Sequence, residues 1–314
     1  MSETRQIAPD ERRGILARSL DSDLLHSFLA SKVTVLAAIV TAVFFLGALL
    51  APLIAPHDPF DLRQISIMDS LVPPAWSDMG DPRFLLGTDD QGRDILSAIM
   101  YGARISLAVG FCSVILAAII GITLGLVAGY VGGFTDTVIM RIADVQLTFP
   151  AILIALLING SVHAVMDVTR EQSAFWVLVV SIGLSFWVQY ARTVRGSTLV
   201  ERNREYVQAA RVIGVHPIRI MIRHVLPNVM GPVLVIATIN LALAIITEAT
   251  LSFLGVGIPP TQPSLGTLIR IGQDFLFSGE WWITIFPGFA LAALVLAVNL
   301  LGDWLRDALN PKLR

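Results

Sequence analysis

Long apolar runs dominate the pattern of this chain. Six stretches contain no Asp, Glu, Lys or Arg: residues 33–56, 105–135, 145–162, 173–191, 225–247 and 281–302. A helix needs about 20 mostly apolar residues to cross a bilayer, and in lipid its peptide groups must be satisfied within the helix. The pattern therefore predicts an all-α membrane protein with six transmembrane helices.

The polar segments between these runs divide the chain into parts. We expect an N-terminal tail over residues 1–32, a first transmembrane helix over 33–56, a loop over 57–103, a core of five transmembrane helices over 104–303, and a C-terminal tail over 304–314. The loop at 57–103 is rich in Pro, Asp and Gly, so it is too polar to cross lipid.

The distribution of charge predicts the orientation of the chain. Hydrophobic residues make up 55% of the sequence and charged residues only 15%, so the few clusters of charged residues indicate which segments lie outside the bilayer. Arginines concentrate in the tails and in the segment at 192–223, whereas the loop at 57–103 is rich in Asp. Positive residues remain on the cytoplasmic side, so both termini are expected to be cytoplasmic and the loop extracytoplasmic.

Three glycines in the second run lie at four-residue spacing: Gly121, Gly125 and Gly129. This spacing places them on one face of a helix, where another backbone can approach closely. The partner helix can belong to the same chain or to another subunit, and spacing alone does not separate these alternatives.

Glu248 is an acidic residue that directly follows the fifth apolar run, towards the outer end of the fifth predicted span. An ionised carboxylate is costly in the hydrocarbon region, so Glu248 should face protein or water. It is a candidate pathway or gate residue. The alternative, a structural residue hydrogen-bonded to neighbouring helices, is favoured because no second intramembrane acid or base accompanies it to form a proton relay.

The basic segment at 200–228 retains helical periodicity. Tyr206, Ala209, Ala210 and Ile213 fall on one predicted face of a short helix, which Gly214 ends in a left-handed conformation. Pro217 suits the first turn of a second short helix, which Pro227 is expected to end. Two such helices would form a rigid knob for docking into a soluble partner. The alternative is a basic loop that lies on anionic lipid.

The sequence offers no catalytic or metal-binding arrangement. The five histidines are scattered without the spacing of metal ligands, and Cys112 is the single cysteine. The only lysines, Lys32 and Lys312, do not follow the Gly-rich turn of a nucleotide-binding loop. We therefore expect no enzyme, no metal site and no cofactor in this chain, with any nucleotide chemistry on another polypeptide.

The segment at 200–228 resembles a known signature. Gln208-Ala209-Ala210, three residues, Gly214, nine residues and then His224-Val225-Leu226-Pro227 is similar to the E-A-A-x3-G-x9-I-x-L-P pattern of the permeases of binding-protein-dependent ABC importers. Gln208 replaces the Glu of that pattern, and His224 replaces the Ile.

Four further stretches resemble the second, C-type permease of the dipeptide, oligopeptide and nickel branch of this family. They lie at 140–144, 248–255 and 302–311, and at 86–94, where the extracytoplasmic motif contains Gly87, Thr88, Asp89, Gly92, Arg93 and Asp94. Asp89, Asp90 and Asp94 also suit helix capping better than a calcium loop.

The resemblance implies a type I importer permease fold in a bacterial inner membrane. It implies a homologous permease, two cytoplasmic ATPase subunits that carry ATP and Mg, and an extracytoplasmic substrate-binding protein as partners. Alternating access is the implied mechanism. The residues implied to couple this chain to the ATPases are Glu205, Tyr206, Gln208, Ala209, Ala210, Gly214, Leu226 and Pro227. The loop at 57–100 would meet the binding protein.

The resemblance favours peptides as the substrate, while nickel complexes, glutathione, opines and oligosaccharides stay open for relatives of this kind. A secondary carrier or channel without ATP coupling is the alternative function, and a membrane scaffold ranks third. A secondary carrier would be expected to show inverted repeats or an ion-coupling constellation within the membrane, and Glu248 alone does not supply one.

Overall fold

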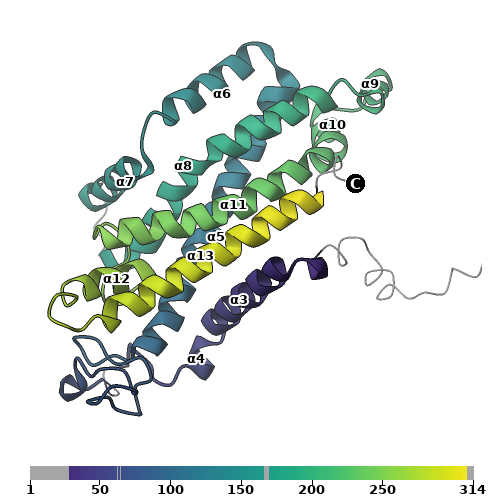
Figure 1. Cartoon of the computed structure of the whole chain (residues 1–314). Helices are drawn as coiled ribbons and strands as arrows, with labels where there is room; N and C mark the ends of the chain where they lie inside the picture. The colour runs from purple at the N-terminus through teal and green to yellow at the C-terminus, as the bar shows by residue number, and fades with distance from the viewer. Residues whose placement is uncertain (1–27, 62, 64, 166–169, 310–314) are drawn as a thin grey trace, which may run out of the picture.

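The computed structural model describes residues 28–61, 63, 65–165 and 170–309, so the expected tails at 1–32 and 304–314 lie partly outside the described residues. The described residues form a bundle of helices (Figure 1). The helices are α3 (Lys32–Leu49), α4 (Ala51–Ile54), α5 (Ile95–Val131), α6 (Gly133–Gln146), α7 (Ala151–Val165), α8 (Arg170–Glu201), α9 (Glu205–Val212), α10 (Pro217–Ile220), α11 (Leu226–Phe253), α12 (Leu265–Gln273) and α13 (Trp282–Leu309).

Among the described residues, five helical segments are long and apolar enough to cross a membrane: α3, α5, α8, the continuous segment Pro217–Phe253 and α13. The predicted third span corresponds to α6 and α7, which together pass the same test but meet at an angle of 92°. The all-α class is therefore confirmed, and the expected number of six spans is reached when this bent pair is counted as one.

Prolines explain the breaks in two of the expected spans. Pro150 lies between α6 and α7, where its ring disfavours a helical conformation at Phe149 and its nitrogen has no hydrogen to donate. Pro52 lies in the first turn of α4, so the predicted single helix at 33–56 is instead α3 followed by a separate short turn. Each break divides a predicted span into two helices, and for α6 and α7 it changes the chain direction by 92°.

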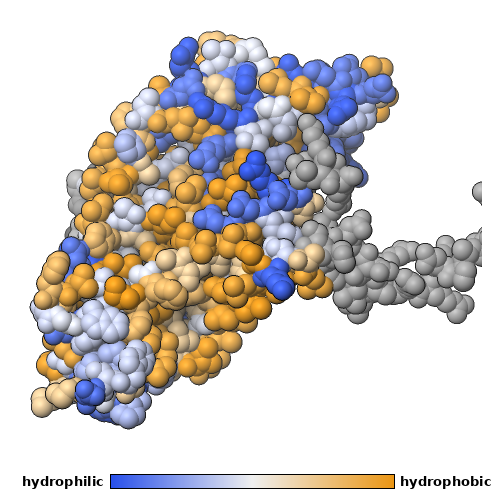
Figure 2. Space-filling view, viewed as in Figure 1, coloured by the Kyte–Doolittle hydropathy of each residue, from blue (hydrophilic) through white to orange (hydrophobic). Residues whose placement is uncertain are grey.

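The bundle has two polar ends. The start of α3, the end of α13 and the short helices α9 and α10 lie together at one end, called here the α9 end (Figure 1). Phe28 and Trp304 stack edge to face there, with ring centroids 5.1 Å apart. The segment between α4 and α5 lies with α12 at the opposite end, called here the loop end. Figure 2 shows apolar side chains over the middle of the molecule and hydrophilic residues gathered at the α9 end.

The glycine stripe of α5 packs against α8 of the same chain. A Cβ atom on Gly125 would lie 2.5 Å from the main-chain oxygen of Ala191, and one on Gly129 would lie 2.7 Å from Cβ of Thr198. Gly121 faces Trp187 and Tyr190 of α8 in the same way. The stripe therefore serves packing within the chain, which resolves the alternative that its spacing left open.

Candidate docking surface

The helix α9 ends in a complete Schellman motif. Gly214 has φ +77°, its N–H group donates to the oxygen of Arg211 at 3.0 Å, and the N–H group of Val215 donates to the oxygen of Ala210 at 3.0 Å. This pair of bonds satisfies carbonyl groups that the last helical turn would otherwise leave open. The predicted left-handed cap at Gly214 is present.

The side chains of α9 divide between the bundle and the surface. Val207 and Ala210 are 0% and 5% exposed, and they belong to the same buried cluster as Ile220 and Val225. Ala209 and Gln208 are exposed. The sequence places Ala210 on one face with Tyr206, Ala209 and Ile213, but in the structure burial against the following helical segment separates Ala210 from them, because a four-residue apolar period does not reveal which side of a helix has a partner.

Tyr206 connects α9 to α8 and α11 by hydrogen bonds. Its hydroxyl group donates to a carboxylate oxygen of Glu201 at the end of α8 and accepts from Nδ2 of Asn228 in α11 at 3.1 Å. Partial burial and the nearby Glu201 carboxylate both raise the pKa of the Tyr206 phenol, so the phenol retains the proton that it donates. Tyr206 thus joins three helices at one point.

Pro227 does not end the second short helix, contrary to expectation. α10 passes through a π-helical turn at Met221–Val225 directly into α11, and Pro227 lies in the first turn of α11 next to Leu226. A proline within a helix has no N–H group to donate, and the wider π turn directly before Pro227 accommodates its ring. The segment at 200–228, called here the docking segment, is therefore continuous from Pro217 onward with a membrane-spanning helix.

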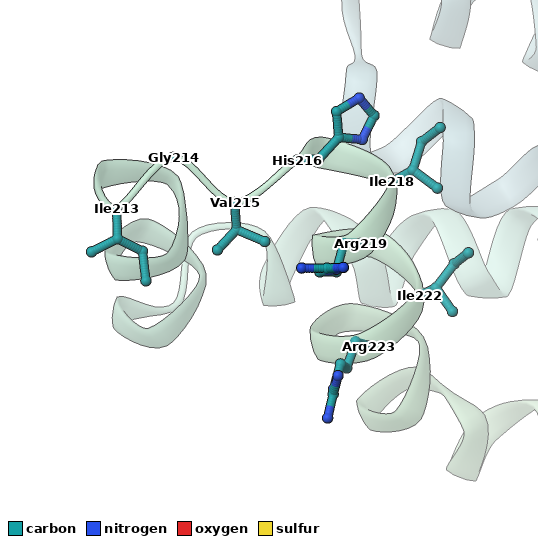
Figure 3. A pocket seen from close by; sticks show the side chains of 8 residues that line it. All are labelled: Ile213, Gly214, Val215, His216, Ile218, Arg219, Ile222 and Arg223. Carbon is teal, nitrogen blue, oxygen red and sulfur yellow. The ribbon is translucent and has the colours of Figure 1, made fainter.

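The two short helical segments enclose a shallow open groove of about 860 Å³ (Figure 3). Ile213 lines it from the end of α9, while Ile218, Ile222, Arg219 and Arg223 line it from α10 and the π turn. Ile213, Ile218 and Ile222 are 77%, 54% and 58% exposed. Exposed isoleucines on the polar end of the molecule, flanked by cations, are typical of a surface that a partner covers.

Two arginines of this segment bind the end of α5, which the sequence did not indicate. The guanidinium group of Arg211 lies 4.9 Å from the centroid of the Tyr130 ring, and Nη1 of Arg202 donates to the main-chain oxygen of Gly129 at 2.9 Å. Cations at the C-terminal end of a helix interact favourably with its free carbonyl groups. These arginines therefore hold the docking segment against α5.

At the loop end, Asp89 and Arg93 form a buried ion pair. Their side chains are 1% and 3% exposed, and Nε of Arg93 donates to Oδ2 of Asp89 at 2.6 Å. Asp89 also accepts from the main-chain N–H groups of Gln91 and Arg93, each at 2.9 Å. This motif residue thus shapes the turn before α5 and does not face solvent.

The remaining motif residues bind neighbouring segments. The Trp282 indole of α13 donates to the oxygen of Thr88 at 3.0 Å, and Gly87 has φ +83° with no room for a Cβ beside that indole. Gly92 has φ +78° and packs against Ser66. Asp94 caps α5 by accepting from the Ser97 main-chain N–H group at 2.8 Å, as the sequence predicts. The motif therefore attaches the loop to α5 and α13.

Glu248 lies buried between three helices. It is 0% exposed, and its two carboxylate oxygens accept from the hydroxyl groups of Ser106 in α5 at 2.6 Å and Ser252 in α11 at 2.7 Å. Ser106 also accepts from the N–H group of Leu265 at the start of α12, at 3.3 Å. Within this chain, Glu248 therefore holds α5, α11 and α12 together at the loop end.

Comparisons with known proteins match this architecture. A dipeptide transport system permease protein, DppC, of Haemophilus influenzae is 42% identical over 85% of this chain and 86% of its own length. DppC of Escherichia coli is 40% identical over 92% of both chains. The permease fold also matches a chain of the inward-facing MetNI methionine ABC transporter, with a TM-score of 0.54 and 19% identity over 68% of this chain and 96% of that one.

Two family descriptions together cover most of the chain. Residues 19–74 match the N-terminal transmembrane domain of oligopeptide transport permease C. Residues 121–314, which include the docking segment and Glu248, match the binding-protein-dependent transport system inner membrane component. The chain therefore belongs to the family of inner-membrane components of binding-protein-dependent transport systems.

Proposed function

We propose that this chain is one of two permease subunits of an ATP-driven peptide importer, and that its α9 end receives the movement of ATPase subunits. The observation that carries the proposal is the rigid docking segment, in which an exposed apolar edge with flanking arginines continues without a break into a membrane-spanning helix. A push on α9 or α10 therefore acts directly on α11 and, through Tyr206, on α8.

The proposed orientation places the α9 end in the cytoplasm. Both chain ends then face the cytoplasm, and the loop end meets a substrate-binding protein outside the membrane. The loop offers exposed apolar side chains for that contact, because Ile67, Met68 and Met79 are 82%, 92% and 83% exposed. The buried motif at 86–94 would act as the base that holds this contact surface still.

Docking explains the segment better than adsorption to lipid. A lipid-bound loop gains from each cation separately. Arg202 and Arg211 instead bind α5, and the prominent Ile213 lies at a rigid cap beside the groove. We infer a soluble partner with an apolar cleft and acidic neighbours, which suits the ATPase subunits of the implied importer.

The relatives named for dipeptide transport support peptides as the substrate of this chain. For Glu248, we propose the structural role. Both of its oxygens are occupied by serine hydroxyl groups of the same chain, so the carboxylate closes a helix junction and does not line a path.

Gly214→Asp is expected to leave the chain inserted and folded but to abolish uptake. No atom lies within 4 Å of a Cβ at this position, so folding bears only the left-handed backbone cost of about 1 kcal/mol. The new carboxylate adds a negative charge to the groove that Arg219 and Arg223 also line, and it reduces the positive charge that a partner would meet.

The measurement purifies tagged chains in mild detergent, identifies co-purifying proteins by mass spectrometry and assays ATPase activity and peptide uptake. Gly214→Asn is the matched control, because Asn has the same shape, tolerates the left-handed conformation and carries no charge. We expect a second permease and ATPases with the parent and the Asn variant. Normal uptake by the Asp variant would contradict the role of this surface.

A further inference from the structure

A cavity of about 350 Å³ opens at the loop end, apart from the docking segment. Phe60 lines it from the loop, Glu171 and Phe175 line it from α8, and Ile258, Thr261 and Gln262 line it from the segment between α11 and α12. Of the described residues that line the cavity, Glu171 is the charged one. The cavity therefore combines one carboxylate, aromatic faces and neutral hydrogen-bonding groups.

Two of the buried charged groups of the loop end, Arg93 and Glu248, hold one wall of this cavity. Nη1 of Arg93 donates to the main-chain oxygen of Pro260 at 3.1 Å. The N–H group of Ile258 donates at 3.1 Å to Oγ of Ser252, which in turn donates to Glu248. The segment between α11 and α12 is thus fixed at two points by residues that are inaccessible to solvent.

Phe60, which lines the cavity from the loop, is held in place as well. The main-chain N–H group of Phe60 donates to Oδ1 of Asp58 at 2.9 Å, and the Phe60 ring contacts Tyr101 of α5 edge to face, with centroids 5.3 Å apart. The segment between α11 and α12 and the residue Phe60 are therefore both held in place beside the cavity, and such preorganisation is typical of a binding site.

We propose that this cavity is a subsite that receives the amino-terminal ammonium end of a peptide on its way through the permease. The inference rests on the proposed peptide importer and adds the part of the substrate that this chain contacts. Glu171 supplies the counter-charge, and the Phe60 and Phe175 rings supply faces that attract a cation or pack against the first side chain. Arg93 and Glu248 are positioning residues, because they act through the wall segment.

The test reconstitutes the complete importer, with its second permease, ATPases and binding protein, in liposomes and measures uptake of alanyl-phenylalanine per ATP hydrolysed. Glu171→Gln removes the charge and retains the shape. We expect about fivefold less peptide per ATP, the loss that one charge contact in a water-exposed site predicts. Stimulation of ATP hydrolysis by the loaded binding protein should remain unchanged.

Two further variants separate the site from a general effect of charge. Glu171→Asp restores the carboxylate and should return uptake to within about twofold of the parent, because the charge remains within reach of the cavity. Asp274→Asn removes an exposed acid at the end of α12, at the same end of the molecule but outside the cavity and outside the loop, and should change nothing.

Uptake by Glu171→Gln equal to the parent would overturn the subsite while leaving the importer in place. A parent importer that hydrolyses ATP in response to its binding protein but takes up no alanyl-phenylalanine would overturn the peptide class and this inference with it. A parent without any such stimulation would contradict the proposed function itself.

Discussion

Gly125→Leu should prevent assembly of the bundle. A Cβ atom at this position would lie 2.5 Å from the Ala191 main-chain oxygen and 3.0 Å from Cβ of Val194, so α5 and α8 would have to separate along their shared face. Overpacking typically costs about 1–3 kcal/mol, and a main-chain atom that cannot rotate aside places this change at or above that upper end. The yield of monodisperse chain in detergent should fall at least about fivefold, since about 1.4 kcal/mol corresponds to a tenfold change in an equilibrium.

Gly196→Leu is the matched control for this prediction. Gly196 lies on α8 near the same interface, yet nothing lies within 4 Å of an added Cβ there. The control should insert and purify like the parent. Equal yields for both variants would show that the packing of α5 against α8 does not limit assembly.

Arg93→Met should destabilise the folded structure of the loop end. The substitution leaves Asp89 buried without its cation and removes the hydrogen bond to Pro260. Breaking a buried ion pair by removal of one partner costs about 3–5 kcal/mol, which is a large part of the stability of an ordinary domain. Limited proteolysis of the loop at 57–94 should become at least tenfold faster, and the melting temperature in nanodiscs should fall.

An exposed arginine in the same loop provides the control for the proteolysis measurement. Arg83 pairs with Asp69 and Asp81 on the surface, where its side chain is 59% exposed. Exposed pairs are screened by water and contribute little, so Arg83→Met should leave proteolysis unchanged. The double variant Asp89→Asn with Arg93→Met should recover part of the loss, because it no longer buries an unpaired charge. Equal proteolysis of the Arg93 and Arg83 variants would contradict the anchoring role of the motif.

The sequence predicted the membrane-spanning segments and several local features well, because these depend on nearby residues. Apolar runs of about 20 residues leave little choice of structure in lipid. The left-handed cap at Gly214 and the cap at Asp94 follow from the chemistry of one turn each. Family membership followed from spaced motifs that the comparisons confirm.

Features that depend on a distant partner could not be predicted in this way. The period of the Gly121 stripe gave its face but not its partner, and the same ambiguity grouped Ala210 of α9 with the exposed Ala209 although Ala210 is buried. The effect of a proline depends on the turn before it: the chain remains helical through Pro227, which follows a π turn, and breaks at Pro150. Glu171 could not be predicted as a site residue, because a single acid in the first turn of a helix gives no signal until the fold surrounds it.

The most direct test of the account identifies the molecule that contacts the C-terminal end of α9 in native membranes. The background is a chain in which the single cysteine, Cys112, is replaced by Ala. In this background, Ile213→Cys carries a benzophenone probe. The control is the same probe on Phe277→Cys, because Phe277 is 97% exposed at the loop end. After illumination of native membranes, the account predicts a crosslink from position 213 to a P-loop ATPase subunit and none from position 277. Crosslinks from position 213 to lipid alone would contradict it.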